Sequence, residues 1–155
     1  MSDVSGQLRI QNHITPLDLN SIYSYYLLSV HFRDSCVVAE SQGKVIGFLS
    51  AYCLPQEPQT LFVWQVVVNR LLRGKKVAWR MLESLLQRFE RGELEQVAAT
   101  VNPSNSASRG LFERLATEQG SMLEEEIFLK ATAFGPGSGH ESEILLRVPL
   151  NTHNS

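Results

Sequence analysis

The sequence has little cysteine, and the two cysteines it has show no pattern. Cys36 and Cys53 stand in separate apolar segments, without the CxxC or Cys/His spacing of a metal site. Such residues are typical of reduced, buried thiols rather than of a disulfide. The four histidines are scattered, and His140 has no partner at ligand spacing. We therefore expect neither a disulfide nor a metal ion.

Long apolar runs and an excess of one charge sign are also missing. No segment approaches the roughly 18 apolar residues of a membrane-spanning helix, and residues 1–6 lack the pattern of a signal peptide. Fourteen Lys and Arg stand against sixteen Asp and Glu, for a net charge of −2. A surface that neutralises phosphate backbones has the opposite excess. We therefore expect a cytoplasmic protein that binds neither a membrane nor nucleic acid.

Apolar sequence is abundant enough for one domain. The chain has 155 residues, of which 43% are hydrophobic and 19% charged, with ten Gly and six Pro. Chains near this size bury roughly two thirds of their unfolded surface. The length excludes two full domains, and the composition excludes disordered, collagen-like and low-complexity classes.

The order of periodic segments indicates an α/β fold with mixed strand directions. Apolar residues at helical spacing predict helices over Asn20–Phe32, over 77–89, and from the turn at 102–104 to Gly120. Extended runs predict strands over 36–40, 44–52, 60–68 and 96–101, with further strand candidates at 127–128 and 144–148. The first two strands form a hairpin about 41–43, and a loop with Pro55 and Pro58 follows them.

Two strand-to-helix junctions contain the candidate functional residues. At the first, Arg73-Gly74-Lys75-Lys76-Val77-Ala78 opens a helix, whose unpaired N–H groups and dipole favour an anion such as a phosphate. A solvated basic loop has the same composition, so spacing alone does not decide between the two. At the second, Asn102 to Ser108 contains residues that also form ordinary caps and turns.

Acidic and aromatic residues elsewhere are ambiguous in isolation. Asp18 could be only a helix cap, and Trp64, in an apolar strand, could be only a core residue. The charges of 139–143 precede the last strand, where surface loops often carry charge without function.

Taken together, the two junctions resemble those of the GCN5-related N-acetyltransferases. Arg73-Gly74-Lys75 followed by Ala78 matches much of that family's pyrophosphate loop, and Asn105 with Ser108 matches its later helix motif. Further segments are similar to the members that acetylate L-2,4-diaminobutyrate in ectoine biosynthesis. These segments are 17–21, 23–25, 31–32, 60–66, 99–105 and 139–141.

The resemblance implies a mixed, mostly antiparallel sheet with splayed strands flanked by helices, and acetyl-CoA as cosubstrate. It implies an acetyltransferase domain over 16–150, between a short segment over 1–15 and a tail over 151–155. The implied coenzyme-binding residues are Val66, Val67, Val68, Arg73, Gly74, Lys75, Lys76, Val77, Ala78, Asn105 and Ser108.

The substrate implied by the resemblance is a small zwitterion with two amines. A primary amine with a pKa near ~10 is protonated at neutral pH, so a base must remove a proton before attack. We assign Glu143 as the first choice of base and Asp18 as the acid that holds the charged C2 ammonium, while the C4 amine is acetylated. The implied substrate-binding residues are Asp18, Asn20, Tyr23, Trp64, His140 and Glu143.

The sequence departs from the family pattern in three places. Lys76 replaces a glycine of the pyrophosphate turn. Phe112 replaces the tyrosine that many members use as a general acid, so the leaving thiolate must take its proton from another donor, such as water. Only about fifteen residues precede Pro16, so part of the usual first strand and helix is expected to be missing. The resemblance implies a homodimer, and that shortening would also leave Tyr25, Tyr26 and Leu27 uncovered, as apolar surface in an interface between copies is.

Two other functions fit the same residues. An acidic pocket also holds other small diamines or polyamines, and the chain could bind acetyl-CoA without turnover. A covalent acyl-enzyme is disfavoured, because neither Cys nor Ser stands beside a plausible base.

Overall fold

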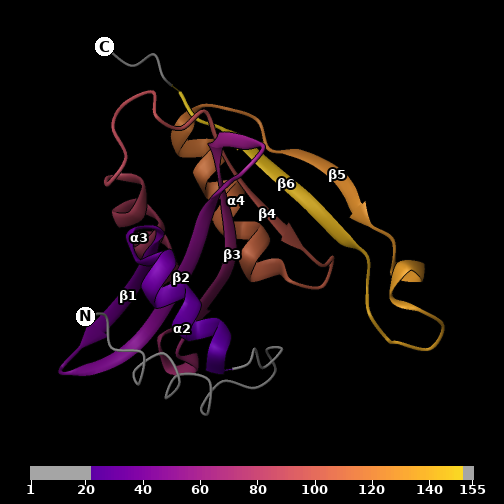
Figure 1. Ribbon diagram of the computed structural model, residues 1–155, viewed down its shortest axis with the longest axis horizontal. Helices are drawn as coiled ribbons and strands as arrows, with labels where there is room; N and C mark the ends of the chain where they lie inside the picture. The colour runs from indigo at the N-terminus through magenta and orange to yellow at the C-terminus, as the bar shows by residue number, and fades with distance from the viewer. Residues whose placement is uncertain (1–21, 152–155) are drawn as a thin grey trace. The chain divides into compact units, whose positions relative to one another are not determined.

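The computed structural model describes residues 22–151 of the chain (Figure 1). The chain divides into two compact units, Met1–Tyr52 with Val63–Phe89, and Cys53–Phe62 with Glu90–Ser155. We call these unit 1 and unit 2. Strand β3 contributes residues to both.

Six strands form a mixed sheet in the order β1-β2-β3-β4-β6-β5. Strand β4 is parallel to β3, whereas β1 is antiparallel to β2, and β6 is antiparallel to both β4 and β5. The strands are β1 Cys36–Ser41, β2 Lys44–Leu54, β3 Glu57–Val68, β4 Gln96–Val101, β5 Glu124–Leu129 and β6 Glu143–Pro149. The helices are α2 Ile22–His31, α3 Val77–Leu86 and α4 Ser106–Gln119, with 3-10 turns η1 Arg33–Ser35, η2 Arg70–Leu72 and η3 Ala131–Phe134. The predicted α/β class is confirmed.

The predicted hairpin of unit 1 forms because its turn residues accept positive φ. Gln42 and Gly43 have φ of 51° and 71°, which suits the twist of two antiparallel strands. Further along β2, Gly47 has no side chain, which lets the backbone of β3 and helix α3 approach it closely. A Cβ at Gly47 would lie 2.9 Å from the Val67 carbonyl oxygen and 3.2 Å from Met81 Cε.

Helix α2 contributes its buried face to the core of unit 1. Tyr25 is fully buried, and its ring meets Phe48 edge-on at a centroid distance of 5.9 Å. Leu28 and Val67 complete this cluster. The expectation that Tyr25 is uncovered is therefore wrong, because Tyr25 lies on the sheet-facing side of α2 while Tyr26 and Leu27 remain exposed.

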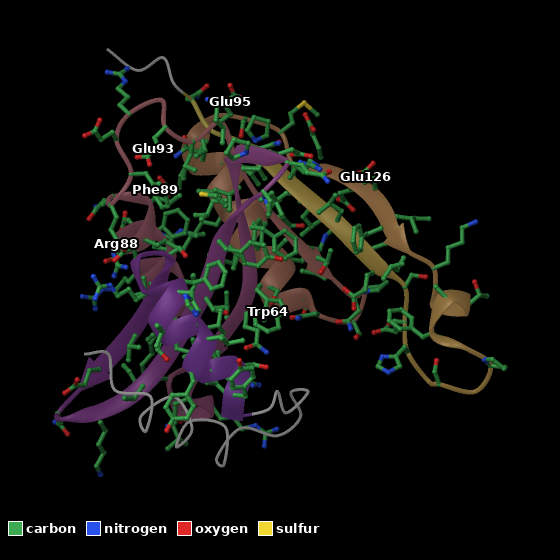
Figure 2. The ribbon with its side chains drawn as sticks, in the orientation of Figure 1. Trp64, Arg88, Phe89, Glu93, Glu95 and Glu126 are labelled. Carbon is green, nitrogen blue, oxygen red and sulfur yellow. The ribbon has the colours of Figure 1, made fainter. Side chains whose placement is uncertain are left out.

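Helix α3 buries the predicted apolar stripe but ends earlier than the predicted residue 89. Met81, Leu82 and Leu85 are buried, and the helix stops at Leu86. The next amides, of Arg88 and Phe89, donate to carbonyls three residues back, which tightens the chain out of the α-helix. Arg88, labelled in Figure 2, donates from Nη1 to the carbonyls of Asp34 and Cys36 at 3.0 and 2.9 Å.

Helix α4 covers one face of the strands in unit 2. On that face the paired residues Val97 and Val148, and Ala99 and Leu146, are all buried. The predicted start and end of the helix are confirmed. Asn105 Oδ1 accepts from the Ser108 amide at 3.1 Å, and Gly120 ends the helix with a φ of 60°.

Two predicted segments differ from the structure. Strand β5 is longer than 127–128, because three glutamates extend it where hydropathy gives no signal. The predicted loop with Pro55 and Pro58 is a tight turn at 55–56, and Pro58 lies inside β3. The predicted start of the first helix, and the expected loss of a first strand, fall on residues outside those described.

Both cysteines are free, as predicted, but they are half-buried rather than buried. Burial raises the pKa of Cys36, against the opposing effects of a hydrogen bond with the Ala51 backbone and the Arg88 charge. Burial and then the Glu93 carboxylate raise the pKa of Cys53. Over residues 22–151 we find no group of His, Cys, Asp and Glu that could hold a metal ion, and no helix with the length and hydropathy to cross a membrane.

Candidate active site

The first junction is a tight basic turn at the N-terminus of α3. Asn69 Oδ1 accepts from the Leu71 amide at 3.0 Å, which starts the short turn η2. Gly74 and Lys76 then both adopt left-handed backbone conformations, with φ of 78° and 61°. The first helical hydrogen bond runs from the Arg80 amide to the Lys76 carbonyl at 3.0 Å. Lys76 is therefore the N-cap, and its side chain makes no cap hydrogen bond.

This turn presents charge and backbone donors together. The side chains of Arg73, Lys75 and Lys76 are exposed, and the amides of the first helical turn, at Val77 and Ala78, have no preceding helical carbonyl to bind. The helix dipole adds partial positive charge at the same end. The arrangement suits a bound anion with several oxygens, as a pyrophosphate has.

Strand β3 leads directly into this turn. Its pairing with β4 joins Thr60–Phe62 to Gln96–Ala98, and β3 then continues to Val68. Val67 is buried in the core of unit 1, whereas Val66 and Val68 are half-buried.

Aromatic side chains of unit 1 are exposed where the sequence predicts a substrate wall. Trp64, labelled in Figure 2, is 41% exposed, which is too much for a core position. Tyr23 on α2 is 69% exposed. Next to Trp64, the side-chain oxygen of Gln65 is buried without a hydrogen-bond partner among the described residues. A buried amide oxygen without a hydrogen bond costs free energy of folding. Gln65 is therefore a candidate site residue that the sequence alone did not indicate.

The second junction is built mainly from capping interactions. The Asn105 side chain caps α4 through the Ser108 amide, which is the ordinary structural role considered for it. Ser104, one residue earlier, donates from Oγ to Glu141 Oε2. A single sequence does not indicate this pair, because the two residues are 37 positions apart.

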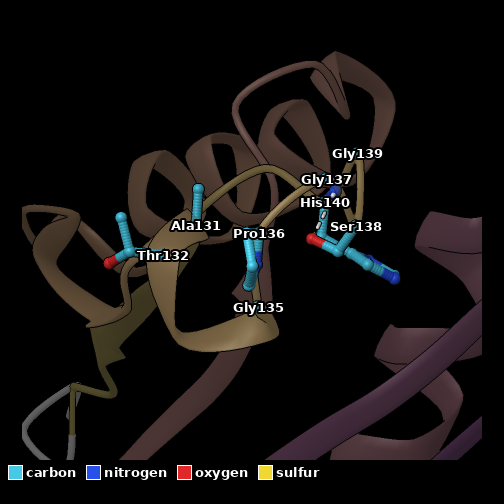
Figure 3. A pocket seen from close by; sticks show the side chains of 8 residues that line it. All are labelled: Ala131, Thr132, Gly135, Pro136, Gly137, Ser138, Gly139 and His140. Carbon is cyan, nitrogen blue, oxygen red and sulfur yellow. Dashed lines mark hydrogen bonds between the residues drawn. The ribbon is translucent and has the colours of Figure 1, made fainter.

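The loop over 131–142 carries His140 and leads to Glu143. It surrounds an open hollow of about 420 Å³ (Figure 3). His140 is exposed and stacks on Phe134 at a centroid distance of 4.9 Å. Glu143 is half-buried at the start of β6, where it pairs with Leu129 of β5. The hollow is lined by Ala131, Thr132, Gly135, Pro136, Gly137, Ser138, Gly139 and His140.

The predicted site residues are thus distributed over both units. Unit 1 contains Tyr23, Trp64, 66–68 and 73–78, and unit 2 contains Asn105, Ser108, His140 and Glu143. Asp18 and Asn20 lie outside the described residues.

A basic glycine turn at a helix N-terminus, reached from a strand of a mixed sheet, defines the class of site that binds a phosphate-bearing ligand. The model of the acetyltransferase (GNAT) family matches residues 8–116. The chain belongs to this family.

Relatives within the family share one name. L-2,4-diaminobutyric acid acetyltransferase of Bordetella parapertussis is 47% identical over 139 residues, which are 89% of this chain and 74% of the relative. The protein of the same name in Vibrio cholerae is 41% identical over 139 residues, 90% of this chain and 80% of the relative.

A solved structure supports the fold directly. Diaminobutyrate acetyltransferase EctA from Paenibacillus lautus, in complex with its substrate L-2,4-diaminobutyric acid and coenzyme A, superposes with a TM-score of 0.89 at 36% identity. The match covers 99% of this chain and 92% of that one. The predicted family, fold and enzyme class are therefore confirmed.

Proposed function

We propose that this chain transfers the acetyl group of acetyl-CoA to the C4 amine of L-2,4-diaminobutyrate, giving N4-acetyl-L-2,4-diaminobutyrate for ectoine biosynthesis. The observation that carries the proposal is a fold match over almost the whole chain to an enzyme bound to this diamine and to coenzyme A. The exposed basic turn at α3, which suits an anion, supports it from this chain's own residues.

The turn at α3 is the proposed pyrophosphate site. Arg73, Lys75 and Lys76 would contribute charge, and the amides at 77 and 78 would donate to phosphate oxygens. A backbone N–H of residues 66–68 would polarise the thioester carbonyl, as a fixed donor does in acyl transfer. Asn105 and Ser108, at the start of α4, complete the proposed coenzyme site.

The chemical step is direct attack by a neutral amine. Glu143 takes a proton from the C4 ammonium, and the nitrogen then attacks the thioester carbonyl carbon. An N–C bond forms and the C–S bond breaks. As the intermediate collapses, the nitrogen loses its second proton to water, and the coenzyme A thiolate takes a proton from water, so the protons balance. The residue in place of the family's tyrosine, Phe112, is only 1% exposed and has no acidic proton, so it has no part in this transfer.

The diamine is proposed to lie between two carboxylates and aromatic walls. Asp18 would hold the C2 ammonium, and Asn20, Tyr23, Trp64 and His140 would line the substrate. Gripping the C2 ammonium leaves the C4 amine directed at the thioester. A desolvated ammonium without a carboxylate is heavily penalised, so diamines should be preferred over monoamines.

The working form is proposed to be a cytoplasmic homodimer that binds neither nucleic acid nor a membrane. Helix α2 supports a dimer, because Tyr26 and Val30 within it are 52% and 66% exposed, and Phe32, just after its end, is 41% exposed. Apolar surface of this kind commonly lies in an interface between copies of a chain.

Release of the coenzyme A thiol across a panel of amines tests the function. L-2,4-diaminobutyrate should be the best acceptor, ahead of ornithine and simple polyamines, and NMR should place the acetyl group on the C4 nitrogen. Acetylation of the C2 nitrogen would refute the proposed geometry. Coenzyme binding by calorimetry, without thiol release on any diamine, would instead indicate a binding module.

A further inference from the structure

The loop over 131–142 is closed at its base, and its internal backbone hydrogen bonds are short-range, from the amides of Ala133, Gly135 and Ser138 to the carbonyls of Lys130, Thr132 and Gly135. The Ala131 amide donates to Ser142 Oγ at 3.0 Å, which joins the two ends of the loop. Within it, Gly135, Gly137 and Gly139 have φ of 90°, 77° and 70°. Glycines in such conformations leave a loop with many accessible backbone states. The Phe134–His140 stack restrains the side chains inside the loop.

A side-chain hydrogen bond connects this loop to a different part of unit 2. Ser104 Oγ, in the turn before α4, donates to Glu141 Oε2. The two residues meet because Val101 at the end of β4 pairs with Ile144 near the start of β6, which places the adjoining loops side by side.

Ser104 is the fixed partner of this contact. The Asn105 amide donates to the Asn102 carbonyl at 2.9 Å, and the Ser106 amide donates to the Ser104 carbonyl at 3.0 Å. The turn is therefore held by its own backbone and by the cap of α4, and the Ser104 hydroxyl presents a donor in a defined place. In the sequence, Glu141 lies between His140 and Glu143, the two residues of unit 2 that the proposed function assigns to the substrate.

We propose that the Ser104–Glu141 hydrogen bond positions the 131–142 loop for the substrate, with Ser104 and Glu141 as positioning residues that do not touch the reacting atoms. This inference rests on the proposed function. A hydrogen bond with a carboxylate restrains the glycine-containing loop against the turn before α4. His140 is then held in place before the diamine binds, beside Glu143, which strand pairing with Leu129 already holds. This lowers the entropy cost of binding.

Steady-state kinetics of the full chain test this role. Ser104→Ala should raise the KM for L-2,4-diaminobutyrate by roughly 3- to 10-fold, the effect of one hydrogen bond, and leave the KM for acetyl-CoA unchanged. Ser104→Thr keeps the hydroxyl and should restore the KM. Ser106→Ala, an exposed serine two positions away, is the matched control. Combining Ser104→Ala with Glu141→Ala should add little to either single change, because both remove the same bond.

Hydrogen exchange on the unliganded protein measures the tether itself. Amides of 135–141 should exchange faster in Ser104→Ala than in Ser106→Ala. An unchanged KM for the diamine in an active Ser104→Ala enzyme would overturn the proposal, and so would a raised KM for acetyl-CoA, which would make Ser104 a coenzyme contact. If the unaltered chain fails to acetylate any diamine, the proposed function fails and the substrate role falls with it, whatever the exchange rates show.

Discussion

Lys76 holds a backbone conformation that suits glycine better. Its φ of 61° brings the Cβ of any other residue close to the backbone, at a cost of roughly 1–2 kcal/mol. Lys76→Ala and Lys76→Gly both remove the charge, but only glycine removes the strain. Lys76→Gly should therefore be about 1 kcal/mol more stable to denaturant than Lys76→Ala, and should have the lower KM for acetyl-CoA. Equal stability of the two variants would contradict a strained turn.

Arg73 tests the proposed pyrophosphate site. Its exposed guanidinium stands one residue before Gly74, and a charge-assisted contact with phosphate is worth about 1.5–3 kcal/mol. Arg73→Ala should raise the KM for acetyl-CoA by one to two orders of magnitude and change the KM for the diamine little. Lys44→Ala, in the β1–β2 hairpin, removes the same charge and is the control. An unaltered coenzyme KM in Arg73→Ala would remove the assignment.

Substitution of the two proposed carboxylates should change different kinetic constants. Asp18→Asn deletes charge at constant shape, so it should mainly raise the KM for the diamine. Glu143→Gln should mainly lower kcat, and raising the pH should partly restore it by supplying neutral amine without a base. Full pH profiles of both variants separate these effects. If both variants lose activity equally, and raising the pH does not restore the Glu143→Gln enzyme, Glu143 is a binding group and not the base.

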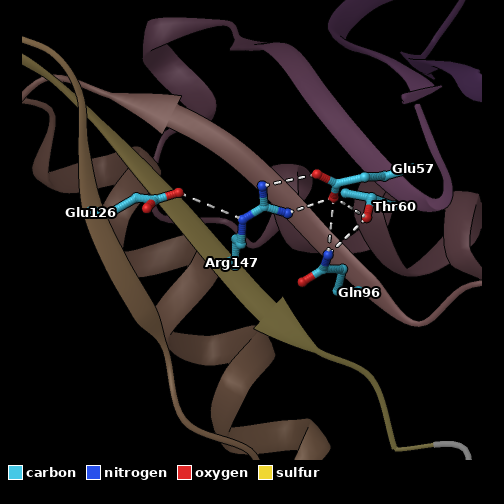
Figure 4. Close-up of polar contacts among 5 residues, drawn as sticks. All are labelled: Glu57, Thr60, Gln96, Glu126 and Arg147. Atoms are coloured by element: carbon cyan, nitrogen blue, oxygen red, sulfur yellow. Dashed lines mark hydrogen bonds and ion pairs between the residues drawn. The ribbon is translucent and has the colours of Figure 1, made fainter. Parts of the chain in front are cut away.

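At the scale of elements, one polar cluster joins the strands of unit 2. Figure 4 shows Arg147 of β6 between Glu57 of β3 and Glu126 of β5. Arg147 Nη1 donates to Glu57 Oε2 at 2.8 Å, and Gln96 Nε2 donates to Thr60 Oγ1 at 2.8 Å. The hydrogen bonds from Arg147 and then Thr60 lower the pKa of Glu57 from its ordinary value of 4.5.

The lowered pKa of Glu57 determines how the free energy of unfolding changes with pH. The contribution of Glu57 is fully present above pH 4.5, its unfolded value, and is lost as the pH falls toward the lower folded value. The difference in stability between the native chain and Arg147→Met should therefore shrink below pH 4.5, as measured by urea unfolding. In a Glu57→Gln background, the pH dependence of that difference should be reduced. A difference that grows on acidification would contradict the assignment.

Helices and turns that depend on residues close in sequence could be predicted. Strand segments that form only by pairing with a distant strand could not. The stripe of α3, the caps of α4 and the hairpin turn at 42–43 all depend on residues close in sequence. The start of β5 is different, because Glu124, Glu125 and Glu126 are in a strand only through pairing with β6. Proline at 58 likewise suggested a loop, although β3 accepts it near its first residue.

The candidate site shows the same division. The basic turn at the N-terminus of α3 could be predicted from Arg73 to Ala78, because a helix N-terminus and its charges are local. The left-handed φ of Lys76 is a backbone property that its residue type does not suggest. The contact between Ser104 and Glu141 depends on the register of β4 and β6, which a single sequence does not provide.

For the whole molecule, the dimer is a prediction about mass. The chain has a mass of 17.4 kDa, and light scattering at micromolar concentration should give twice that. Combining Tyr26→Ser with Val30→Ser should shift the equilibrium toward single chains, because it removes exposed apolar area from α2. Met122→Ser, at a residue of unit 2 that is 83% exposed, is the control. A mass of 17.4 kDa for the unaltered chain would refute the dimer.

The position of β6 between β4 and β5 has a consequence for synthesis on the ribosome. Strand β5 emerges before β6, but β6 is its hydrogen-bonded neighbour, and β4 also lacks this neighbour until the last strand is made. Until β6 is made, β4 and β5 therefore each have an unpaired strand edge. Ile127 and Phe128 of β5 can then contact other nascent chains. Unit 2 completes its sheet only when residues 143–149 leave the ribosome, so translation that stops short of them should yield aggregated chains.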